Sequence, residues 1–274
     1  MGVSKWLLLM SLLSLSACKW DVPVLGSEAL PEGVKTEIVE FQRNGGAQCP
    51  GNPGVTAENM QCASVKVSYP KVLGEANPAA VDAINQFVLS QLVEFSDEQG
   101  KQATSLEELA SMFIADYQKT PSPLSSWELE RTVTVVFGAG HLITLNFTEN
   151  GYTGGAHPFG GQRYFVFDTT TGKQVTLADL LTPGYESALN VAAEKAFREA
   201  RNIAPDANLE TEGFWFENNV FSVNTNFGLQ ADGMVFAFNP YEVAPYVMGP
   251  TEFTVPYEDI GDVIGADSLL AALR

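Results

Sequence analysis

The sequence predicts an α+β fold with mostly antiparallel sheets, three main amphipathic helices and two coupled modules. Segments with helical periodicity are separated along the chain from runs of strand-like segments. The links between successive strand-like segments are short and turn-like, which favours antiparallel pairing. Of the 274 residues, 45% are hydrophobic and 18% are charged, which is the composition of a folded chain and not of an acidic disordered one.

Helical periodicity predicts the three amphipathic helices, and each has a start or stop signal. An Asn-Pro pair precedes the first helix, and basic residues occupy the last turns of the third. Ser105 and Glu108 have the spacing of a capping box at the start of the second. The apolar faces run over residues 80–95, 106–117 and 189–197.

Alternation of apolar and polar residues predicts strands on both sides of the third helix. The dipeptides Asn150-Gly151 and Asp232-Gly233 are turn signals between neighbouring strands. The expected strands are 34–41, 63–69, 127–137, 143–147, 164–168, 220–223, 227–229, 234–238 and 253–255, with short helices at 177–181 and 267–270.

The first residues resemble a bacterial lipoprotein leader. Lys5 precedes an apolar run over residues 6–15, which is too short to span a bilayer as a helix. The run ends in Leu15-Ser16-Ala17-Cys18, which resembles the lipobox. We therefore expect residues 1–17 to be a signal peptide and Cys18 to carry a palmitate-type lipid. The alternative is an ordinary secretory signal followed by an unrelated Cys.

The organisation expected after the leader has four parts. Residues 18–33 form the lipid anchor and tether, 34–160 an N-terminal module, 161–260 a C-terminal module and 261–274 a C-terminal helix. The anchor predicts a location in the cell envelope. Because Lys19, and not Asp, follows the lipidated Cys, the outer membrane facing the periplasm is expected if the host is Gram-negative.

Two further cysteines, Cys49 and Cys62, form an even pair in an oxidising compartment, which favours a disulfide. The Pro- and Gly-containing segment between them has the composition of a loop that such a bond closes. The alternative is two free thiols or metal ligands, but neither His141 nor His157 lies at ligand spacing from a cysteine.

The chain is strongly acidic, with 33 Asp and Glu against 15 Lys and Arg and a net charge of −18. Such a surface repels nucleic acid and attracts basic partners. The alternative is that the whole proteome of the host is acidic. No motif for serine, zinc, phosphate-loop or dithiol chemistry is present, so the sequence offers no catalytic residue, metal site or cofactor.

Two segments are candidate ligand-binding loops. The first is glycine-rich and offers Tyr152, Gly154, Gly155 and His157; the alternative is a tight connection whose His bonds to backbone. The second is bounded by prolines and offers Tyr241 and Tyr246. Other aromatic residues between 221 and 257 are candidates for a sugar-stacking surface or for a sheet core.

A series of short motifs carries a family resemblance. In order and spacing they resemble the RsiV/PdaC-like envelope domain pair, over about residues 34–260. The motifs are Tyr152–His157, Asp168–Lys173, Leu177–Leu180, Phe236–Tyr246, Gly249 and Val255–Tyr257.

The resemblance implies an α+β ectodomain of two consecutive modules. The family includes lysozyme-sensing anti-sigma factors, the non-catalytic region of a peptidoglycan deacetylase, and lipoproteins. This chain departs from the first two, since it shows neither a sigma-binding segment nor the Asp and His motifs of a deacetylase domain.

The leading hypothesis is a non-enzymatic envelope lipoprotein that binds a protein or cell-wall ligand. Lysozyme-type muramidases are the most concrete partner because they are basic. The alternatives are a module that binds the peptidoglycan layer, a carboxylate-based hydrolase of wall polymers, and a structural envelope protein.

Overall fold

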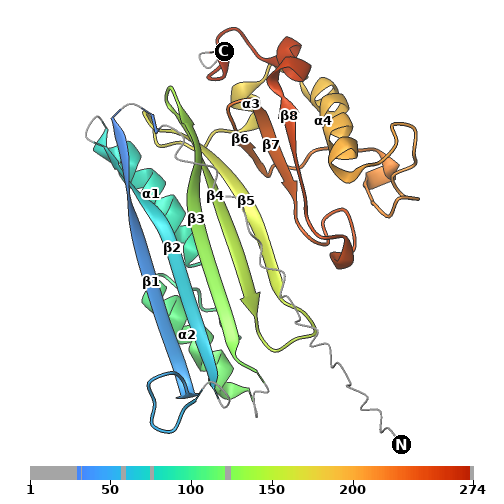
Figure 1. The fold of residues 1–274 in the computed structure, drawn as a ribbon. Coiled ribbons are helices and arrows are strands. Elements are labelled where there is room, and N and C mark those ends of the chain that lie inside the picture. Colours follow the sequence, from blue (N-terminus) through green and yellow to red (C-terminus); the bar gives the residue numbers. More distant parts are fainter. Residues whose placement is uncertain (1–29, 32, 57–59, 75–76, 121–124, 272–274) are drawn as a thin grey trace, which may run out of the picture.

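The computed structural model describes residues 30–31, 33–56, 60–74, 77–120 and 125–271 (Figure 1). The expected signal peptide, the lipidated Cys18 and most of the tether lie outside these residues. No helix within them is both long and apolar enough to cross a membrane.

A five-stranded sheet in the order β1-β2-β3-β4-β5 forms the first part of the fold. Two helices lie along one face of its first strands (Figure 1). The elements are β1 Val34–Gln48, β2 Gln61–Gly74, α1 Pro78–Leu92, α2 Leu106–Lys119, β3 Trp127–Ala139, β4 Leu142–Tyr152 and β5 Phe159–Asp168.

The five-stranded sheet is mixed, because β2 and β3 pair in parallel while the other neighbours are antiparallel. The chain between β2 and β3 crosses over the sheet through α1 and α2, so β3 returns in the direction of β2. The expectation of antiparallel pairing rests on short links between successive strands. The link between β2 and β3 is long, because it contains two helices, and it therefore permits a parallel pair.

The helix starts follow the expected signals, with one difference. The Asn77 side chain accepts from the Ala80 N–H, and the Ser105 hydroxyl accepts from the Glu108 N–H. The Glu108 carboxylate, however, accepts from the backbone N–H of Thr104 at 3.0 Å, one residue before the position of a regular capping box.

The second part is a three-stranded antiparallel sheet, in the order β6-β7-β8, packed against one long helix. Phe197 on that helix lies at the centre of its core, with five aromatic rings at centroid distances of 5.0 to 6.0 Å. The elements are α3 Leu177–Leu180, α4 Glu186–Arg201, η1 Glu217–Asn219, β6 Phe227–Leu229, β7 Gly233–Phe238, η2 Tyr246–Met248, β8 Thr251–Pro256 and η3 Tyr257–Val263.

Three local expectations are wrong. Asn150 and Gly151 are not a turn but lie inside β4, where Phe159 of β5 covers Gly151 and leaves no room for a Cβ. Residues 220–223 form no strand: Phe221 packs into the core, and the Val223 N–H donates to the Asn190 side chain and not to a neighbouring strand. Residues 267–270 form turns after η3 instead of a helix. β5, which begins next to the module boundary expected at 160, pairs with β4 in the first sheet.

Two asparagine side chains join the second part to the outer edge of β5. The Asn239 amide accepts from the Gln162 N–H at 2.7 Å and donates to the Gln162 carbonyl oxygen at 3.0 Å. The Asn226 amide accepts from the Tyr164 N–H at 2.8 Å and donates to the same carbonyl at 2.9 Å. Because an amide holds both a donor and an acceptor, these side chains occupy edge groups that otherwise need a neighbouring strand.

Side chains reinforce this joint. The Glu252 carboxylate on β8 accepts from Gln162 Nε2 at 2.6 Å and from the Tyr164 hydroxyl at 2.8 Å. Burial, and then the charge of Glu252, raise the pKa of Tyr164 above its ordinary value, so the hydroxyl stays protonated and donates. The Thr144 hydroxyl accepts from the Leu229 N–H at 3.1 Å.

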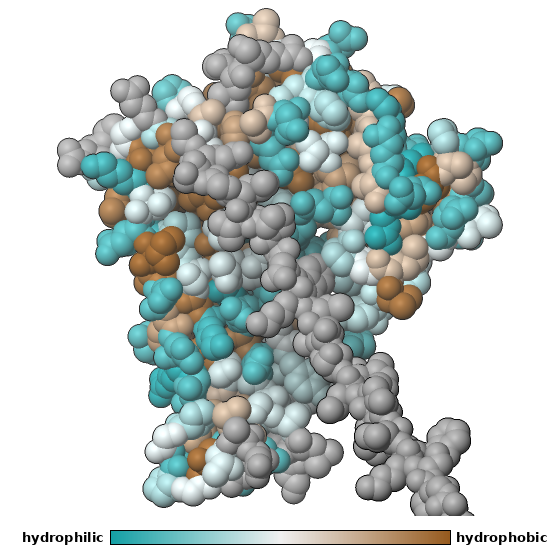
Figure 2. Space-filling model, in the orientation of Figure 1, coloured by the Kyte–Doolittle hydropathy of each residue, from teal (hydrophilic) through white to brown (hydrophobic). Residues whose placement is uncertain are grey.

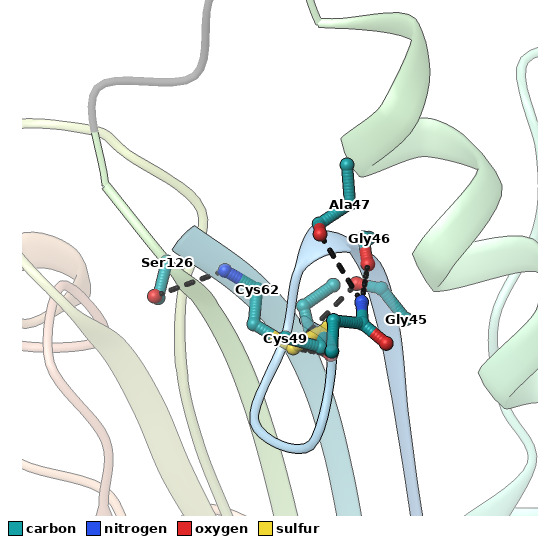
Figure 3. Close-up of a disulfide and its surroundings, with 8 residues drawn as sticks. Gly45, Gly46, Ala47, Cys49, Cys62 and Ser126 are labelled. Carbon is teal, nitrogen blue, oxygen red and sulfur yellow. Dashed lines mark hydrogen bonds between the residues drawn. A yellow bond between two sulfur atoms is a disulfide. The ribbon is translucent and has the colours of Figure 1, made fainter. Parts of the chain in front are cut away.

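The Cys49–Cys62 disulfide is present, as the sequence predicts (Figure 3). It closes the loop between the paired ends of β1 and β2, where Gln48 lies opposite Gln61. Asn52 donates to the carbonyl oxygens of Gly46 and Ala47 at 3.2 and 3.1 Å, which ties the loop to the end of β1.

Replacing both cysteines, Cys49→Ser with Cys62→Ser, should lower the free energy of unfolding by about 3 kcal/mol, because the open loop regains conformational entropy in the unfolded chain. Urea denaturation followed by circular dichroism measures this. The wild-type protein in reductant should unfold at the same urea concentration as the double variant, and an unchanged midpoint in both would contradict the prediction.

Asn239→Ala should lower the free energy of unfolding by about 1–3 kcal/mol, because it leaves the Gln162 N–H without its partner at the joint, while the Gln162 carbonyl oxygen keeps Asn226. Asn44→Ala is the matched control, since Asn44 is exposed on β1 and makes no side-chain hydrogen bond within the described residues. Its effect should stay within about 0.5 kcal/mol. Equal effects of the two substitutions would show that the joint is not a source of stability.

Candidate functional site

The glycine-rich loop between β4 and β5 is exposed and is closed on itself. The Tyr152 hydroxyl donates to the Gly155 carbonyl oxygen at 3.0 Å, and Gly154 adopts a φ of +83° that favours glycine. The His157 Nδ1 lies 2.8 Å from the Pro158 carbonyl oxygen. Tyr152, Gly154 and Gly155 therefore shape the loop, while His157 is the side chain that it presents.

The second predicted loop, residues 239–249, reaches the first from the other half of the chain. Tyr246 stacks on His157 with ring centroids 4.0 Å apart, and its hydroxyl donates to the Pro158 carbonyl oxygen at 2.9 Å. Tyr241 follows at 5.7 Å from Tyr246. Three of the six predicted residues thus form one row of rings, which we call the aromatic row (His157, Tyr246, Tyr241).

Tyr241 ends the row in an unusual backbone conformation. Its φ is +70°, in the left-handed region that non-glycine residues seldom occupy, and its side chain is 59% exposed. Strain of this kind costs about 1–3 kcal/mol and is concentrated at functional sites. An exposed aromatic ring held at this cost is a candidate contact for a ligand.

Trp215, which the sequence did not single out, lies beside the same loop. Its backbone N–H donates to the Val243 carbonyl oxygen at 2.9 Å, and its indole N–H donates to the Glu242 carbonyl oxygen at 3.0 Å. The ring is 45% exposed at an open hollow of about 550 Å³ that Glu217, Ser222 and Glu242 also line. Since the indole N–H is already bonded, the part of the ring that a ligand can contact is its apolar face.

The chain segment that carries this surface is acidic, and Arg201 of α4 is the cation that reaches it among the described residues: its guanidinium donates to the Met248 carbonyl oxygen at 2.9 Å and lies 5.1 Å from the Phe214 ring centroid. Residues 202–273 contain no Lys or Arg, a signal that was present in the sequence. Asp206, Glu210, Glu212 and Glu217 are exposed in the segment that carries Trp215. The acidic residues of this stretch are Asp206, Glu210, Glu212, Glu217, Asp232, Glu242, Glu252, Glu258, Asp259, Asp262 and Asp267.

Hydrophobic side chains are exposed within this acidic stretch. Val220 and Val247 are 65% and 89% exposed. Figure 2 shows hydrophobic atoms at the tip of the loop that carries η2, next to hydrophilic surface. We give the name acidic–aromatic surface to four exposed side chains with the four exposed carboxylates of the same segment. The members are Trp215, Val220, Tyr241, Val247, Asp206, Glu210, Glu212 and Glu217.

The arrangement suits binding by stacking and ion pairing. Glu242 accepts from Asn224 Nδ2 at 3.0 Å, and neither Glu217 nor Glu242, the two carboxylates at the hollow, has an ion-pair partner among the described residues. Among the residues that the structure describes, no group of three or more His, Cys, Asp or Glu side chains is close enough to hold a metal ion.

Two family models match the chain. "Deacetylase PdaC" matches residues 56–159, and "Protein of unknown function (DUF3298)" matches residues 178–258. The chain carries a PdaC domain followed by a DUF3298 domain. This confirms the domain pair expected from the sequence motifs, and both candidate loops lie within or next to the matched residues.

Two crystal structures of DUF3298 proteins have the same fold. One from Bacteroides fragilis aligns with a TM-score of 0.68 at 18% identity and covers 88% of this chain and 98% of its own. One from Pseudomonas aeruginosa aligns with a TM-score of 0.60 at 20% identity and covers 87% of this chain and 95% of its own. These likenesses confirm the fold.

Among curated proteins, the chain is similar to the immunogenic proteins MPT64 of Mycobacterium tuberculosis and MPB64 of Mycobacterium bovis. Each is 30% identical over 136 residues, which is 47% of this chain and 51% of the relative. The chain thus spans about half the length of these relatives. The similarity and the disulfide together indicate an extracytoplasmic PdaC–DUF3298 protein.

Tyr246→Ala should loosen the glycine-rich loop, because it removes the ring stack on His157 and the hydrogen bond to Pro158. Amide hydrogen exchange at the strand ends that border the loop, residues 149–151 and 159–161, should become faster by about tenfold, the equivalent of roughly one hydrogen bond. Tyr241→Gly is the control, since it removes a ring but suits the positive φ and should leave this exchange unchanged. Equal acceleration in both variants would contradict the expected role of Tyr246.

Proposed function

We propose that this protein is a non-enzymatic binding protein of the cell envelope, held at the membrane through a lipid on Cys18, and that its ligand is a basic protein. Lysozyme-type muramidases are the most concrete candidate. The observation that carries the proposal is the acidic–aromatic surface, where exposed hydrophobic side chains lie in a stretch of chain without any Lys or Arg.

The physical argument combines charge with exposed apolar area. Carboxylates around an interface speed the encounter with a basic partner and exclude acidic ones. Exposed Trp and Tyr side chains supply the large, rigid contacts that dominate many protein interfaces. The Trp215 indole donates to the carbonyl oxygen of Glu242, the residue that follows Tyr241, so the two exposed side chains are anchored at neighbouring backbone positions and one partner can reach both.

The resemblance to lysozyme-sensing anti-sigma factors supports the same partner. The aromatic row includes residues from the motifs that carry that resemblance, namely the glycine-rich loop and the Phe236–Tyr246 segment.

Peptidoglycan binding is the second candidate. The hollow beside Trp215 combines an exposed ring face with the Ser222 hydroxyl and two carboxylates, which are groups that can hold a sugar ring. Co-sedimentation with purified sacculi tests it, and binding there should be independent of Glu212 because that residue does not line the hollow.

The deciding experiment is a calorimetric titration of residues 19–274 with a c-type lysozyme at low and moderate salt. We expect saturable binding that weakens as salt rises, because the charges involved are exposed to solvent. Trp215→Ala should weaken binding by tenfold or more, as is typical of an aromatic interface residue, where truncation costs about 2 kcal/mol.

Two double variants that remove the same number of charges distinguish binding at the acidic–aromatic surface from attraction by the net charge of the whole protein. Glu212→Gln with Glu217→Gln should weaken binding several-fold, whereas Glu37→Gln with Glu40→Gln, on the distant strand β1, should not. Equal effects would indicate attraction by net charge only. Absence of heat at both salt concentrations would refute lysozyme as the partner.

A further inference from the structure

A second cavity, of about 310 Å³, lies where the edge of β5 meets α3 and the start of β6. It shares no lining residue with the hollow beside Trp215. Phe165 of the first part and Leu177 and Phe227 of the second supply apolar walls. Its volume is at the lower end of the range for small-molecule sites, about 300–1,000 Å³.

Arg163 is the only charged residue among those that line this cavity. A lone positive charge is unexpected in a chain with 33 acidic and 15 basic residues, and it selects for an anionic group. The guanidinium carbon lies 4.8 Å from the ring centroid of Phe147 and 5.9 Å from that of Phe165, so the two rings hold it in place.

Arg163 already forms an ion pair, but this pair leaves its guanidinium available to a ligand. Its partner Glu94 is on the solvent side, with its side chain 61% exposed, and both guanidinium nitrogens contact the same carboxylate oxygen at 3.3 and 3.2 Å. Exposed pairs of this kind are worth little, about 0–1 kcal/mol. A planar guanidinium has five N–H donors, so a second carboxylate can bind beside Glu94 or replace it.

Neutral polar groups complete the cavity. The Tyr185 and Thr225 hydroxyls line it and make no hydrogen bond within the described residues. Burial, and then the neighbouring Glu186, raise the pKa of Tyr185, so its hydroxyl remains a donor. The cavity therefore has one cation, two hydroxyl-bearing residues without a side-chain partner, the further polar residues Tyr164, Gln174, Thr176 and Asn226, and apolar walls.

We propose that this cavity binds a small amphiphilic carboxylate, with the carboxylate on Arg163 and the hydrocarbon body between Phe165, Leu177 and Phe227. A ligand placed in this way contacts both parts of the fold. The site is independent of the acidic–aromatic surface, so each proposal can fail without the other.

The test is a titration of the mature protein with octanoate and, separately, with the neutral octanamide, followed by NMR of the backbone amides. Octanoate should bind saturably and shift amides of residues 163–165 and 174–178. Arg163→Gln should weaken octanoate at least about tenfold through loss of a charge-assisted pair, and should change octanamide less than twofold. Arg43→Gln, in the same sheet, is the matched control and should change neither.

A second variant fills the mouth of the cavity without altering charge. Ala178 is exposed at the rim, so Ala178→Trp should fold normally and abolish the binding of both probes. Ala200→Trp, at an exposed position of α4 outside the cavity, should have no effect. The proposal is overturned if octanoate shows no saturable binding, if Arg163→Gln retains the wild-type affinity, or if Ala178→Trp still binds; should Arg163→Gln fail to fold, the Ala178→Trp result and the comparison of the two probes decide.

Discussion

The hydrogen bonds of two asparagine side chains to the outer edge of β5 fix how the two halves of this protein sit together. A sheet edge presents N–H and C=O groups that need partners once they are buried. Here Asn226 and Asn239 supply them by side chain, so no sixth strand is required. Gly161 fits this constraint, because a Cβ there would lie 3.0 Å from Asn239 Oδ1.

The position of the candidate site follows from that joint. Asn239 stands at the start of the loop that carries Tyr241 and Tyr246, and Gln162 follows closely after the glycine-rich loop. The Asn239 side chain bonds to the Gln162 backbone, which brings the two loops together, and His157 then stacks on Tyr246. The aromatic row is therefore a consequence of how the halves dock and does not belong to either half alone.

Charge and apolar exposure are unevenly distributed over the fold, and this asymmetry separates the two candidate ligands. The segment around Trp215 is acidic and exposed, which suits a large basic partner. The cavity at the edge of β5 is small and has Arg163 as its one charged lining residue, which suits a small anion with an apolar body. The cavity takes lining residues from both parts, whereas the hollow beside Trp215 is lined by the second part.

The sequence by itself determined the α+β class, the helix starts at Asn77 and Ser105, most strands and the Cys49–Cys62 disulfide, because each depends on local periodicity, capping or cysteine count. It also identified all three members of the aromatic row, but only as residues of two separate loops. Local signals failed at Asn150-Gly151, where cross-strand packing by Phe159 keeps a turn-like dipeptide in a strand. Only the tertiary structure decided the parallel pairing of β2 with β3, the meeting of His157 with Tyr246, the exposure of Trp215 and the cavity at Arg163. Each of these depends on contacts between residues far apart in the chain, which no local pattern encodes.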